Sequence, residues 1–384
     1  MPKHPKRARD LGIPFPGTPG PRNAIVDVDP VAVGHCTVIE EPKVYTGVTA
    51  IWPRGTASAL PVFAGYHAAN GNGELTGAAW IDEGGVIEGP LALTNTYAIG
   101  AVRDGLLRNL RASWRALGLG KQEADYGALP VVAETWDGEL SDIFGFHVTA
   151  DHAREALAAA TDVSSPQPIA EGNVGGGTGM TLFDFKGGIG TSSRVAGKHV
   201  VGVLAQCNFG TLHDLIVAGV PVGRYWDPQA HSKTHPRRKH KGSVIVVIAT
   251  DAPLVPHQLR RLAKRATHGI ARVGAISEDT SGDLFVAFST GELADARPVL
   301  PTQTLDGLFA AVVHATEEAV INALVAARTV KDYKAINLAR LRRALEEHAV
   351  LIEPTAAAPP PAAASRARTP RASARPRPRA SRRR

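Results

Sequence analysis

Residues 239–251 read KHKGSVIVVIATD, so a charged loop runs directly into an apolar strand. The unbroken apolar run over residues 244–249 predicts a strand that is covered on both faces. The boundary is a Gly-Ser dipeptide, in which Gly242 exposes its carbonyl without a Cβ and Ser243 brings a hydroxyl to the mouth of the strand. This is either an ordinary loop-to-strand junction or a self-cleavage site. In the second case Ser243 becomes a new N-terminal residue that carries a nucleophile and its own base.

A polar segment, residues 227–241 (DPQAHSKTHPRRKHK), precedes this junction. It contains five Lys or Arg residues and three His residues, and we expect it to form an exposed surface loop. A loop of this kind also suits cleavage after Gly242, because the two new chain ends must be able to separate. Its His residues have no supporting carboxylates at a metal-ligand spacing, so we expect neither a metal nor a cofactor.

Strands and helices interleave along the chain without a regular strand–helix–strand rhythm. Three near-continuous apolar runs predict strands covered on both faces: 44–52, 199–204 and 244–249. Apolar residues then follow one helical face from Pro256 to Gly274, and two more helices are predicted over 305–324 and 336–348. This mixture predicts a layered α/β sandwich rather than a doubly wound sheet.

The formal net charge of +7 comes from one end of the chain. Residues 355–384 hold nine Arg and no acidic residue, whereas the rest of the chain holds 34 basic and 36 acidic side chains. We therefore predict one domain over residues 1–354, followed by a disordered Arg/Pro/Ala-rich tail without a specific nucleic-acid partner. Two cysteines, no apolar leader and no apolar run of membrane-spanning length predict a cytoplasmic protein that does not contact membranes.

Two further segments carry side chains that suit a hydrolytic site. Asn208 follows a predicted strand, where its amide NH₂ can act as an oxyanion donor or cap a turn. The neighbouring Cys207, with His213 as base, is an alternative nucleophile, although a buried structural thiol is the simpler interpretation. Ser281 and Asp283 place a hydroxyl and a carboxylate on either side of a Gly, which either orients an amine or forms an ordinary turn.

A glycine-rich segment, residues 172–179 (GNVGGGTG), has no phosphate-binding pattern. It lacks the Gly-Lys-Ser/Thr ending of a phosphate loop and does not have the glycine spacing of a dinucleotide-binding loop. We instead expect a tight loop that presents backbone N–H groups near a site.

Together these segments resemble the L-aminopeptidase/D-esterase (β-aminopeptidase) family of self-processing N-terminal-serine peptidases. The likeness extends from Arg7 to about Leu351 and rests on several motifs in the family's order: residues 7–20 (RARDLGIPFPGTPG), 23–28 (NAIVDV), 47–51 (GVTAI), 172–180 (GNVGGGTGM), 242–254 (GSVIVVIATDAPL), 281–283 (SGD) and 288–290 (FST). Such a series is far more specific than a lone Gly-Ser. The resemblance implies a four-layer αββα sandwich, shared with ornithine acetyltransferases, and a homo-oligomer of two-chain units.

The resemblance also implies roles for the candidate residues. Self-cleavage falls on the Gly242–Ser243 bond and gives chains 1–242 and 243–384, with residues 243–354 as the core of the smaller chain. Ser243 is then the nucleophile and Asn208 the oxyanion donor. Ser281 and Asp283 are implied to help hold the substrate or the amine of the nucleophile.

One position departs from the family pattern. Where Glu-Thr-Tyr-Asp-Gly normally supplies a Tyr hydroxyl near the site, this chain has Trp136. An indole donates an N–H but accepts no hydrogen bond in return. We expect Trp136 either to line the substrate pocket or simply to pack. For the ammonium group of an aminopeptidase substrate, the candidate partners are Asp283 and Glu134, since a carboxylate in a cleft suits a free amine.

The implied activity is that of a serine aminopeptidase acting on short peptides, amino-acid amides or esters through an acyl-enzyme on Ser243. The α-amine of an N-terminal residue has a reference pKa of about 7.7–8.0, so its neutral form can accept the hydroxyl proton. Two alternatives stay open. One is an acyltransferase of the ornithine acetyltransferase type, and the other is a scaffold protein in which Trp136 disables the chemistry.

Overall fold

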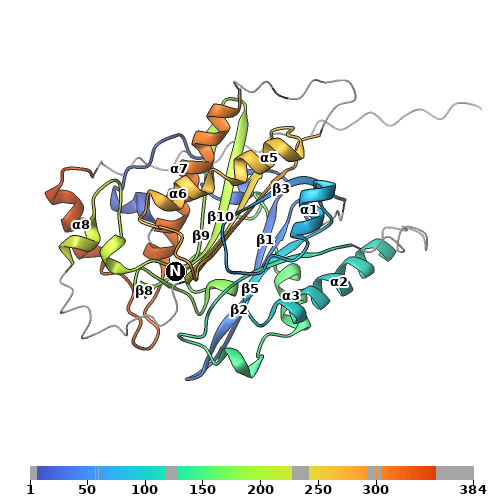
Figure 1. Cartoon of the computed structure of the whole chain (residues 1–384), viewed down its shortest axis with the longest axis horizontal. Coiled ribbons are helices and arrows are strands. Elements are labelled where there is room, and N and C mark those ends of the chain that lie inside the picture. Colours follow the sequence, from blue (N-terminus) through green and yellow to red (C-terminus); the bar gives the residue numbers. More distant parts are fainter. Residues whose placement is uncertain are drawn as a thin grey trace, which may run out of the picture.

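The computed structural model describes residues 7–56, 58, 60–116, 128–226, 242–292, 300 and 304–351. The polar segment 227–241 and the tail 355–384 lie outside these residues, so what the sequence predicts for them stays a prediction. Two large β-sheets and the helices beside them make up most of the described part of the molecule (Figure 1). The α/β class predicted from the sequence is therefore confirmed.

The larger sheet has the Gly-Ser junction at the start of one of its central strands. Its strand order is β4-β3-β12-β11-β10-β9, and only the pair β11–β12 is parallel. Its strands are β3 (Val62–Gly71), β4 (Val86–Ile87), β9 (Gly188–Ala196), β10 (His199–Phe209), β11 (Gly242–Thr250) and β12 (Gly282–Ser289). Both β10 and β11 extend beyond the predicted apolar runs, because the polar residues Asn208 and Ser243 continue the same ladder.

Strand β11 is buried on both faces, as its apolar run predicts. Val244 and Val246 pack into a core that includes helices α5 (Pro256–Ala263), α6 (Ala266–Ala271) and α7 (Leu305–Ala326). Ile245 and Val247 pack into a second core between the two large sheets. Side chains alternate between faces along a strand, so a strand with both faces covered is apolar at every position. The Gly-Ser junction is thus the point at which a fully buried strand begins.

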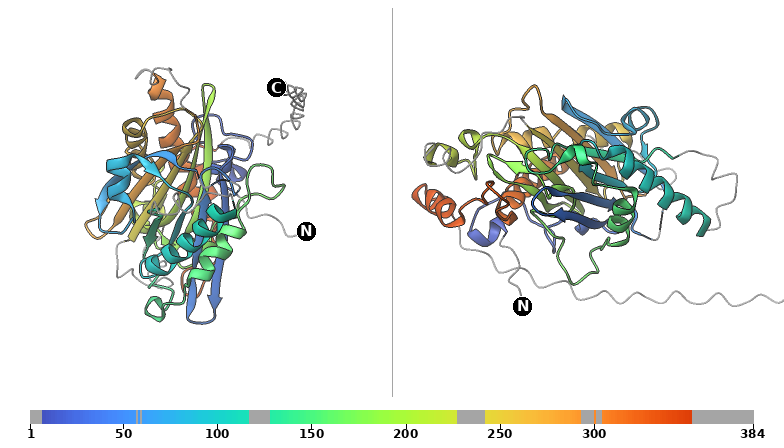
Figure 2. Two further views of the ribbon diagram at one scale, coloured as in Figure 1. Left: turned by 90° about the vertical axis from the view of Figure 1, so that its right-hand side faces the viewer. Right: turned by 90° about the horizontal axis from the view of Figure 1, so that it is seen from below.

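The smaller sheet has the order β1-β2-β5-β6, with β5 and β6 parallel. Its strands are β1 (Ala32–Glu40), β2 (Val44–Trp52), β5 (Leu91–Asn95) and β6 (Val131–Thr135). Strand β2 begins and ends where the sequence predicts, and the left-hand view of Figure 2 shows β1 and β2 in blue, side by side. A third apolar cluster joins this sheet to α2 (Ile99–Ala116) and α3 (Ala150–Ala158).

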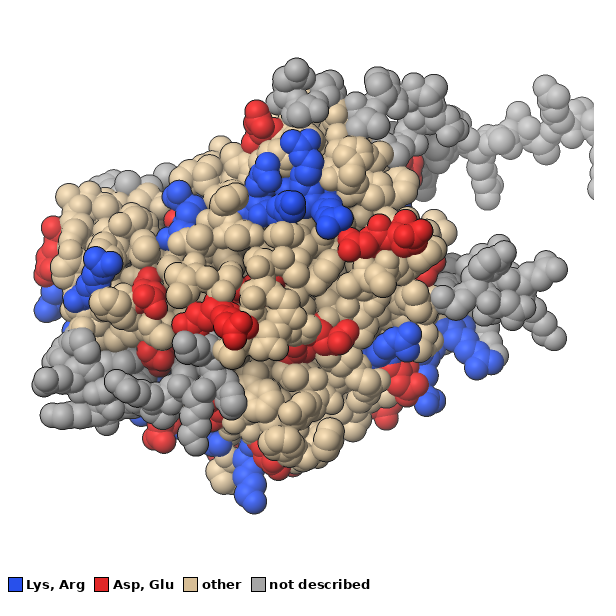
Figure 3. Space-filling view, in the orientation of Figure 1, with Lys and Arg blue, Asp and Glu red and all other residues tan. Residues whose placement is uncertain are grey.

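In Figure 1, α5, α6 and α7 lie on one side of the strands, and α2 and α3 lie on the other. The single helix predicted between Pro256 and Gly274 is in fact two helices, α5 (Pro256–Ala263) and α6 (Ala266–Ala271). The turn between them keeps helical backbone angles, so the buried side continues from Leu262 to Ala266. Basic side chains gather on the outer side of these helices (Figure 3): Arg260, Arg261, Lys264 and Arg265.

The long helix α7 (Leu305–Ala326) corrects one expectation from the sequence. With 22 residues and a mean hydropathy of 1.5 over its most apolar stretch, it reaches the length and composition of a membrane span. However, 83% of that stretch is buried inside the structure, where α7 packs on β9 and β10. A helix that is apolar nearly all round is also what the core of a large domain requires.

The remaining elements are short and frame the ends of the strands. Helix α8 (Leu338–Glu347) lies within the predicted range 336–348. The others are α1 (Ala78–Gly84), the ribbon of β7 (Thr181–Leu182) and β8 (Phe185–Lys186), and the 3₁₀ turns η1 (Ala8–Leu11), η2 (Ile25–Asp27), η3 (Ile143–Gly145), η4 (Gly175–Gly177), η5 (Leu212–Asp214) and η6 (Val222–Tyr225).

Candidate active site

The Gly242–Ser243 bond joins the first two residues of strand β11. The Ser243 hydroxyl donates a hydrogen bond of 2.7 Å to the carbonyl oxygen of Gly242, so Oγ is already beside the carbonyl that it would attack. Gly242 has φ +98°, and a Cβ on it would lie 2.3 Å from the carbonyl oxygen of Asn208. Both facts restrict this position to glycine, because other residues avoid that backbone region and need space for a side chain.

Asn208 lies directly opposite Ser243 in the antiparallel ladder. Its amide oxygen accepts a hydrogen bond of 2.9 Å from Thr181 N, and its amide nitrogen donates one of 2.7 Å to the carbonyl oxygen of Trp136. A backbone donor on one end and a backbone acceptor on the other fix which way the amide points. Asn208, predicted from the sequence as an oxyanion donor, thus lies beside Ser243 with its amide held in one orientation.

Ser281 and Asp283 interact, with the Ser281 hydroxyl donating to Asp283 Oδ1 at 2.6 Å. Gly282, between them, is the ladder partner of Ser243. Burial raises the pKa of Asp283 above its ordinary value, although hydrogen bonds from Ser281 and Ser277 oppose this rise. The predicted hydroxyl–carboxylate pair is thus brought next to the backbone of the nucleophile.

The two halves of the site lie on opposite faces of the larger sheet. Asp283 pairs with Val244, whose side chain lies in the core on the helix side. Ser243 shares its face with Ile245, which lies in the core between the sheets. Paired residues share a face, so the Ser243 hydroxyl and Asn208 face the smaller sheet, whereas Asp283 faces the helices. Asp283 therefore approaches Ser243 from its backbone side.

Glu134 lies on the other sheet, near the carboxyl ends of the parallel strands β5 and β6. Its carboxylate accepts hydrogen bonds from Glu74 N, at 3.0 Å, and from the hydroxyl of Thr96. A Cβ on Gly73 would lie 3.1 Å from both Glu134 Oε1 and the Cα of Gly282. Only Gly73 therefore separates the Glu134 carboxylate from Gly282, the strand partner of Ser243. Burial raises the pKa of Glu134 above its ordinary value.

Trp136 takes part in the site through its backbone as well as its ring. Its carbonyl oxygen is the acceptor that holds Asn208, a bond that does not depend on the side chain at this position. The indole packs edge-on against Tyr97, with ring centroids 5.6 Å apart, and both rings are near Phe144. Trp136 therefore belongs to an aromatic cluster beside Asn208, and Tyr97 and Phe144 in that cluster are partly exposed.

The glycine-rich segment does not present its glycine N–H groups as predicted. The N–H groups of Gly175 and Gly176 donate to the hydroxyls of Thr37 and Thr49 in the smaller sheet. A Cβ on Gly176 would lie 2.2 Å from the side-chain oxygen of Gln206, so glycine is needed here for close packing between the sheets. The site receives a backbone N–H from Thr181, just beyond this segment.

Cys207, the alternative nucleophile, is fully buried in the core on the helix side. That burial raises the pKa of its thiol far above the ordinary value, and a thiol that does not ionise is a poor nucleophile. The side chain of Ser243 faces the other side of the sheet, so the structure favours the hydroxyl over the thiol.

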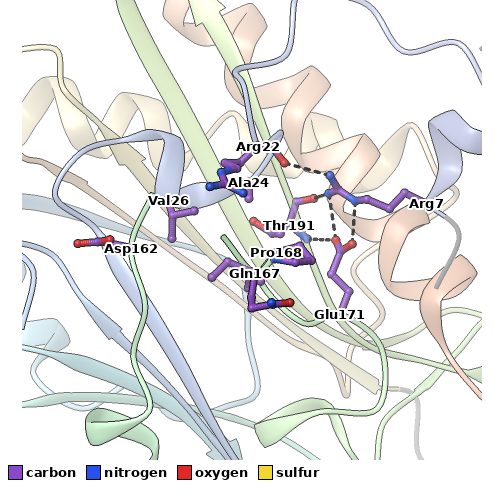
Figure 4. A pocket seen from close by; sticks show the side chains of 10 residues that line it. Arg7, Arg22, Ala24, Val26, Asp162, Gln167, Pro168, Glu171 and Thr191 are labelled. Carbon is purple, nitrogen blue, oxygen red and sulfur yellow. Dashed lines mark hydrogen bonds and ion pairs between the residues drawn. The ribbon is translucent and has the colours of Figure 1, made fainter. Parts of the chain in front are cut away.

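A small cavity elsewhere in the fold is structural in character. Figure 4 shows the Arg7 guanidinium beside it, where it donates to Glu171 at 2.8 Å and to the carbonyl oxygens of Asn23 and Thr191. Arg22 lines the same cavity. Arg7 thus ties the N-terminal segment to β9, and this part of the family motif supports the fold.

A family model, Peptidase family S58, matches residues 23–337. The chain belongs to peptidase family S58. Among curated proteins, the S58 chain is 45% identical over 370 residues to a protein named beta-peptidyl aminopeptidase BapA from Sphingosinicella microcystinivorans, covering 88% of this chain and 90% of the relative. This confirms the resemblance seen in the motifs.

Solved structures of similar proteins agree with this assignment. A beta-aminopeptidase of Burkholderia sp. has a TM-score of 0.79 and 46% identity, covering 89% of the S58 chain and 99% of its own. The L-aminopeptidase D-Ala-esterase/amidase of Ochrobactrum anthropi has a TM-score of 0.79 and 41% identity, covering 90% and 99%. The latter is described as a prototype for the serine aminopeptidases and as a variant of the Ntn hydrolase fold.

Several residues of this site were not found from the sequence of the S58 protein. Thr96 and Tyr97 follow β5 and reach Glu134 and Trp136 only because β5 and β6 are neighbours. Lys186 and Asp137 lie next to the groups that hold Asn208 and are treated below. Asp137 is part of the Glu-Thr-Trp-Asp-Gly motif, so its position in a motif was the one available signal.

Proposed function

We propose that this protein cleaves itself between Gly242 and Ser243 and then acts as an N-terminal-serine aminopeptidase. Its substrates would be short peptides, amino-acid amides or esters that carry a free amine. The observation that carries the proposal is the Ser243 hydroxyl, 2.7 Å from the Gly242 carbonyl oxygen and opposite a doubly held Asn208. The acyltransferase and scaffold alternatives receive no support from the relatives described above.

In the proposed cleavage, Ser243 Oγ attacks the carbonyl carbon of Gly242 and the C–N bond breaks. The acyl group moves from nitrogen to oxygen, and water then hydrolyses the ester to leave a Gly242 carboxylate and a free Ser243 amine. Amide attack has a high barrier, so donors must stabilise the oxyanion that forms. The Asn208 amide, which lies opposite Ser243 in the ladder, would be such a donor.

In the mature enzyme, the neutral α-amine of Ser243 would take the Oγ proton as the substrate is attacked. The Ser281–Asp283 pair supports this role because it flanks the backbone of Ser243 and not its hydroxyl. We propose that the pair orients the amine. The acyl-enzyme on Ser243 is then hydrolysed, with Asn208 stabilising each oxyanion.

We propose that Glu134, rather than Asp283, binds the substrate's ammonium group. Asp283 faces the helices, on the side away from the Ser243 hydroxyl, whereas Glu134 is separated from Gly282 only by Gly73. Trp136, two residues beyond Glu134, and its neighbour Tyr97 would then form the wall next to the substrate's first side chain. The relatives are named for both β- and L-amino acid substrates, so both classes belong in the assay.

We further propose that the fold is the four-layer αββα sandwich shared with ornithine acetyltransferases. Three apolar clusters, one between the sheets and one between each sheet and its helices, support four layers. A homo-oligomer of two-chain units, a cytoplasmic location and action without a cofactor are part of the same proposal. Light scattering of the processed protein measures the number of two-chain units in the oligomer.

The intact mass of the purified protein under denaturing conditions tests the central proposal. The unmodified protein should give two chains, 1–242 and 243–384, whereas Ser243→Ala should give one full-length chain. Ser243→Cys keeps a nucleophile at the same place and should still split. A Ser243→Ala protein that splits at this bond would contradict the proposal, as would an unmodified protein that stays whole and releases no amine from β-amino or L-amino acid amides.

A further inference from the structure

A pair of buried ionisable residues, Lys186 and Asp137, lies next to the supports of Asn208. The two groups that hold the Asn208 amide are Trp136 O and Thr181 N. Asp137 is the residue after Trp136, and Met180 is the residue before Thr181. The carbonyl oxygen of Met180 accepts a hydrogen bond of 2.5 Å from Lys186 Nζ. Trp136 O is therefore one residue from Asp137, and Thr181 N is one residue from the Met180 carbonyl that Lys186 bonds.

Lys186 has no exposed surface, and no other lysine is buried in the part of the chain that the structure describes. Its ammonium group donates to three backbone carbonyl oxygens, those of Met180 (2.5 Å), Gly187 (2.9 Å) and Gly177 (3.4 Å). These three bonds tie the end of the glycine-rich segment to β8. A buried ammonium is costly to form, so its three acceptors are groups whose positions it determines strongly.

Asp137 is equally buried and is the acidic group that favours the charged form of Lys186. Burial lowers the pKa of Lys186 to about 7, although the Asp137 carboxylate opposes this fall, and burial raises the pKa of Asp137 to about 7. Asp137 packs closely on the glycine-rich segment, since a Cβ on Gly179 would lie 2.7 Å from the Asp137 Cβ. Asp137 in turn begins the turn that accepts the N–H groups of Leu140 and Ser141.

We infer that Lys186 is the positioning residue for Asn208. Lys186 bonds the Met180 carbonyl and so fixes the following N–H of Thr181, which donates to the Asn208 amide oxygen. The amide of Asn208 is held between that N–H and the Trp136 carbonyl, opposite Ser243. The inference rests on the proposed function, because it assigns Lys186 a role in oxyanion stabilisation that the self-cleavage and the aminopeptidase reaction share.

A role in stability alone predicts a different outcome from a role in positioning. Loss of buried hydrogen bonds lowers the unfolding temperature wherever it occurs. Misplacement of an oxyanion donor also slows every step that passes through an oxyanion, without changing how the substrate's amine is bound. A displacement of about 1 Å near reacting groups costs on the order of 100-fold in rate.

The test compares Lys186→Met with the matched variant Lys331→Met, in otherwise complete protein. Lys331 also donates to a backbone carbonyl, that of Leu140 at 2.8 Å, but it is not next to either support of Asn208. We expect Lys186→Met to slow self-cleavage and kcat by about 10–100-fold with KM within about threefold of the unmodified value. Lys331→Met should match the unmodified protein in both rates.

A second variant removes both charges, Asp137→Asn together with Lys186→Met, so that no lone carboxylate stays buried. If Lys186 only balances charge, the double variant regains normal self-cleavage and kcat, and the inference is wrong. If Lys186 positions Asn208 through its donated bonds, both rates stay low in the folded double variant. The double variant decides the question even if Lys186→Met alone does not fold.

Failure of the proposed function is distinguishable from failure of this inference. An unmodified protein that neither splits nor hydrolyses amides contradicts the proposed function and, with it, the assigned role of Lys186. An unmodified protein that does both, next to a Lys186→Met protein with the same rates, overturns the inference and leaves the proposed function intact.

Discussion

Two buried polar clusters in this molecule are built in opposite ways. In the first, here called the ionic cluster, the Glu318 carboxylate receives Arg194 at 2.6 Å and Arg9 at 2.9 Å, and Asn23 also donates to it. Burial alone would raise the pKa of Glu318, but the two guanidinium groups outweigh it and the pKa is lowered. This cluster joins the N-terminal segment and β9 to α7. It therefore links the two chains, 1–242 and 243–384, that the proposed cleavage would produce.

In the second, the active site, the carboxylates face neutral donors. Glu134 is held by a backbone N–H and the Thr96 hydroxyl, and Asp283 is held by Ser281. Burial raises the pKa of both groups.

The difference separates a structural cluster from a functional one. A buried carboxylate with two arginines is already satisfied, whereas one held only by neutral donors is stabilised further by a cation that arrives. An aminopeptidase supplies two such cations, the substrate's ammonium and the α-amine of the nucleophile. The neutral donors around Glu134 and Asp283 therefore fit the amine-binding roles that we propose for these residues.

The largest expected contrast comes from two buried asparagines. Asn208 and Asn322 each accept from one backbone N–H and donate to one backbone carbonyl. Asn208 lies in the candidate active site, and Asn322 lies on α7, one helical turn beyond Glu318 of the ionic cluster. Asn208→Ala should lower kcat and the self-cleavage rate by about 10²–10³-fold, because it removes an oxyanion donor. Asn322→Ala should leave both rates within about twofold while costing a similar amount of stability, about 1–3 kcal/mol.

Steady-state kinetics and denaturant unfolding of the two variants check this contrast. Unfolding is best compared in the Ser243→Ala background, where we expect one uncut chain. Equal effects of the two substitutions on kcat would show that the two clusters do not differ as described.

A change in the ionic cluster should affect stability and not the reaction. Glu318→Gln leaves Arg194, which is 1% exposed, without its opposite charge, and should lower the free energy of unfolding by about 3 kcal/mol. The adjacent Glu317→Gln is the control, since its partner Arg272 is 45% exposed, and it should cost less. In folded protein, kcat should be unchanged by either variant. A Glu318→Gln protein as stable as the control would contradict this view of the cluster.

A change at Glu134 should affect binding of the amine. Glu134→Gln removes the negative charge opposite the substrate's ammonium, and we expect KM to rise by about 10–100-fold with a smaller change in kcat. An N-acetylated ester, which has no ammonium, should be hydrolysed equally by both proteins. If the variant slows the acetylated substrate just as much, Glu134 does not bind the amine.

The smallest expected effect is on the pH profile. Because burial raises the pKa of Glu134, its carboxylate becomes protonated, and loses the charge that binds the amine, at a higher pH than an ordinary Glu. As the pH falls, kcat/KM should therefore decline before it reaches the ordinary range of a Glu side chain. Glu134→Gln should remove this decline of kcat/KM at low pH. The increase of kcat/KM near the α-amine pKa, about 7.7–8.0, should stay in place.

The sequence was most informative where one local pattern determines one structure. The apolar run after Ser243 required a strand covered on both faces, because any polar position there would be buried without a partner. The same reasoning placed β2 and α7 closely. It was wrong about the break between α5 and α6, where the amphipathic pattern continues across a tightened turn and so gives no sign of it.

The motifs identified Ser243, Asn208, Ser281 and Asp283 but not how they are divided between two faces of a sheet. That division follows from the ladder, in which Ser243 is opposite both Asn208 and Gly282. It also favours Glu134 over Asp283 as the proposed amine-binding carboxylate, where the sequence left both as candidates. No pattern of spacing along the chain contains this information, because Glu134 belongs to the other sheet.

By itself, the sequence determined the chemistry of this protein: a glycine that exposes a carbonyl, a serine that follows it, and a buried strand that begins there. Those features depend on neighbouring residues, whose geometry the chain fixes directly. Only the tertiary structure decided which carboxylate is satisfied and which awaits an amine, and which lysine supports Asn208. Those properties depend on burial and on contacts between residues tens to hundreds of positions apart, and both arise only when the two sheets pack together.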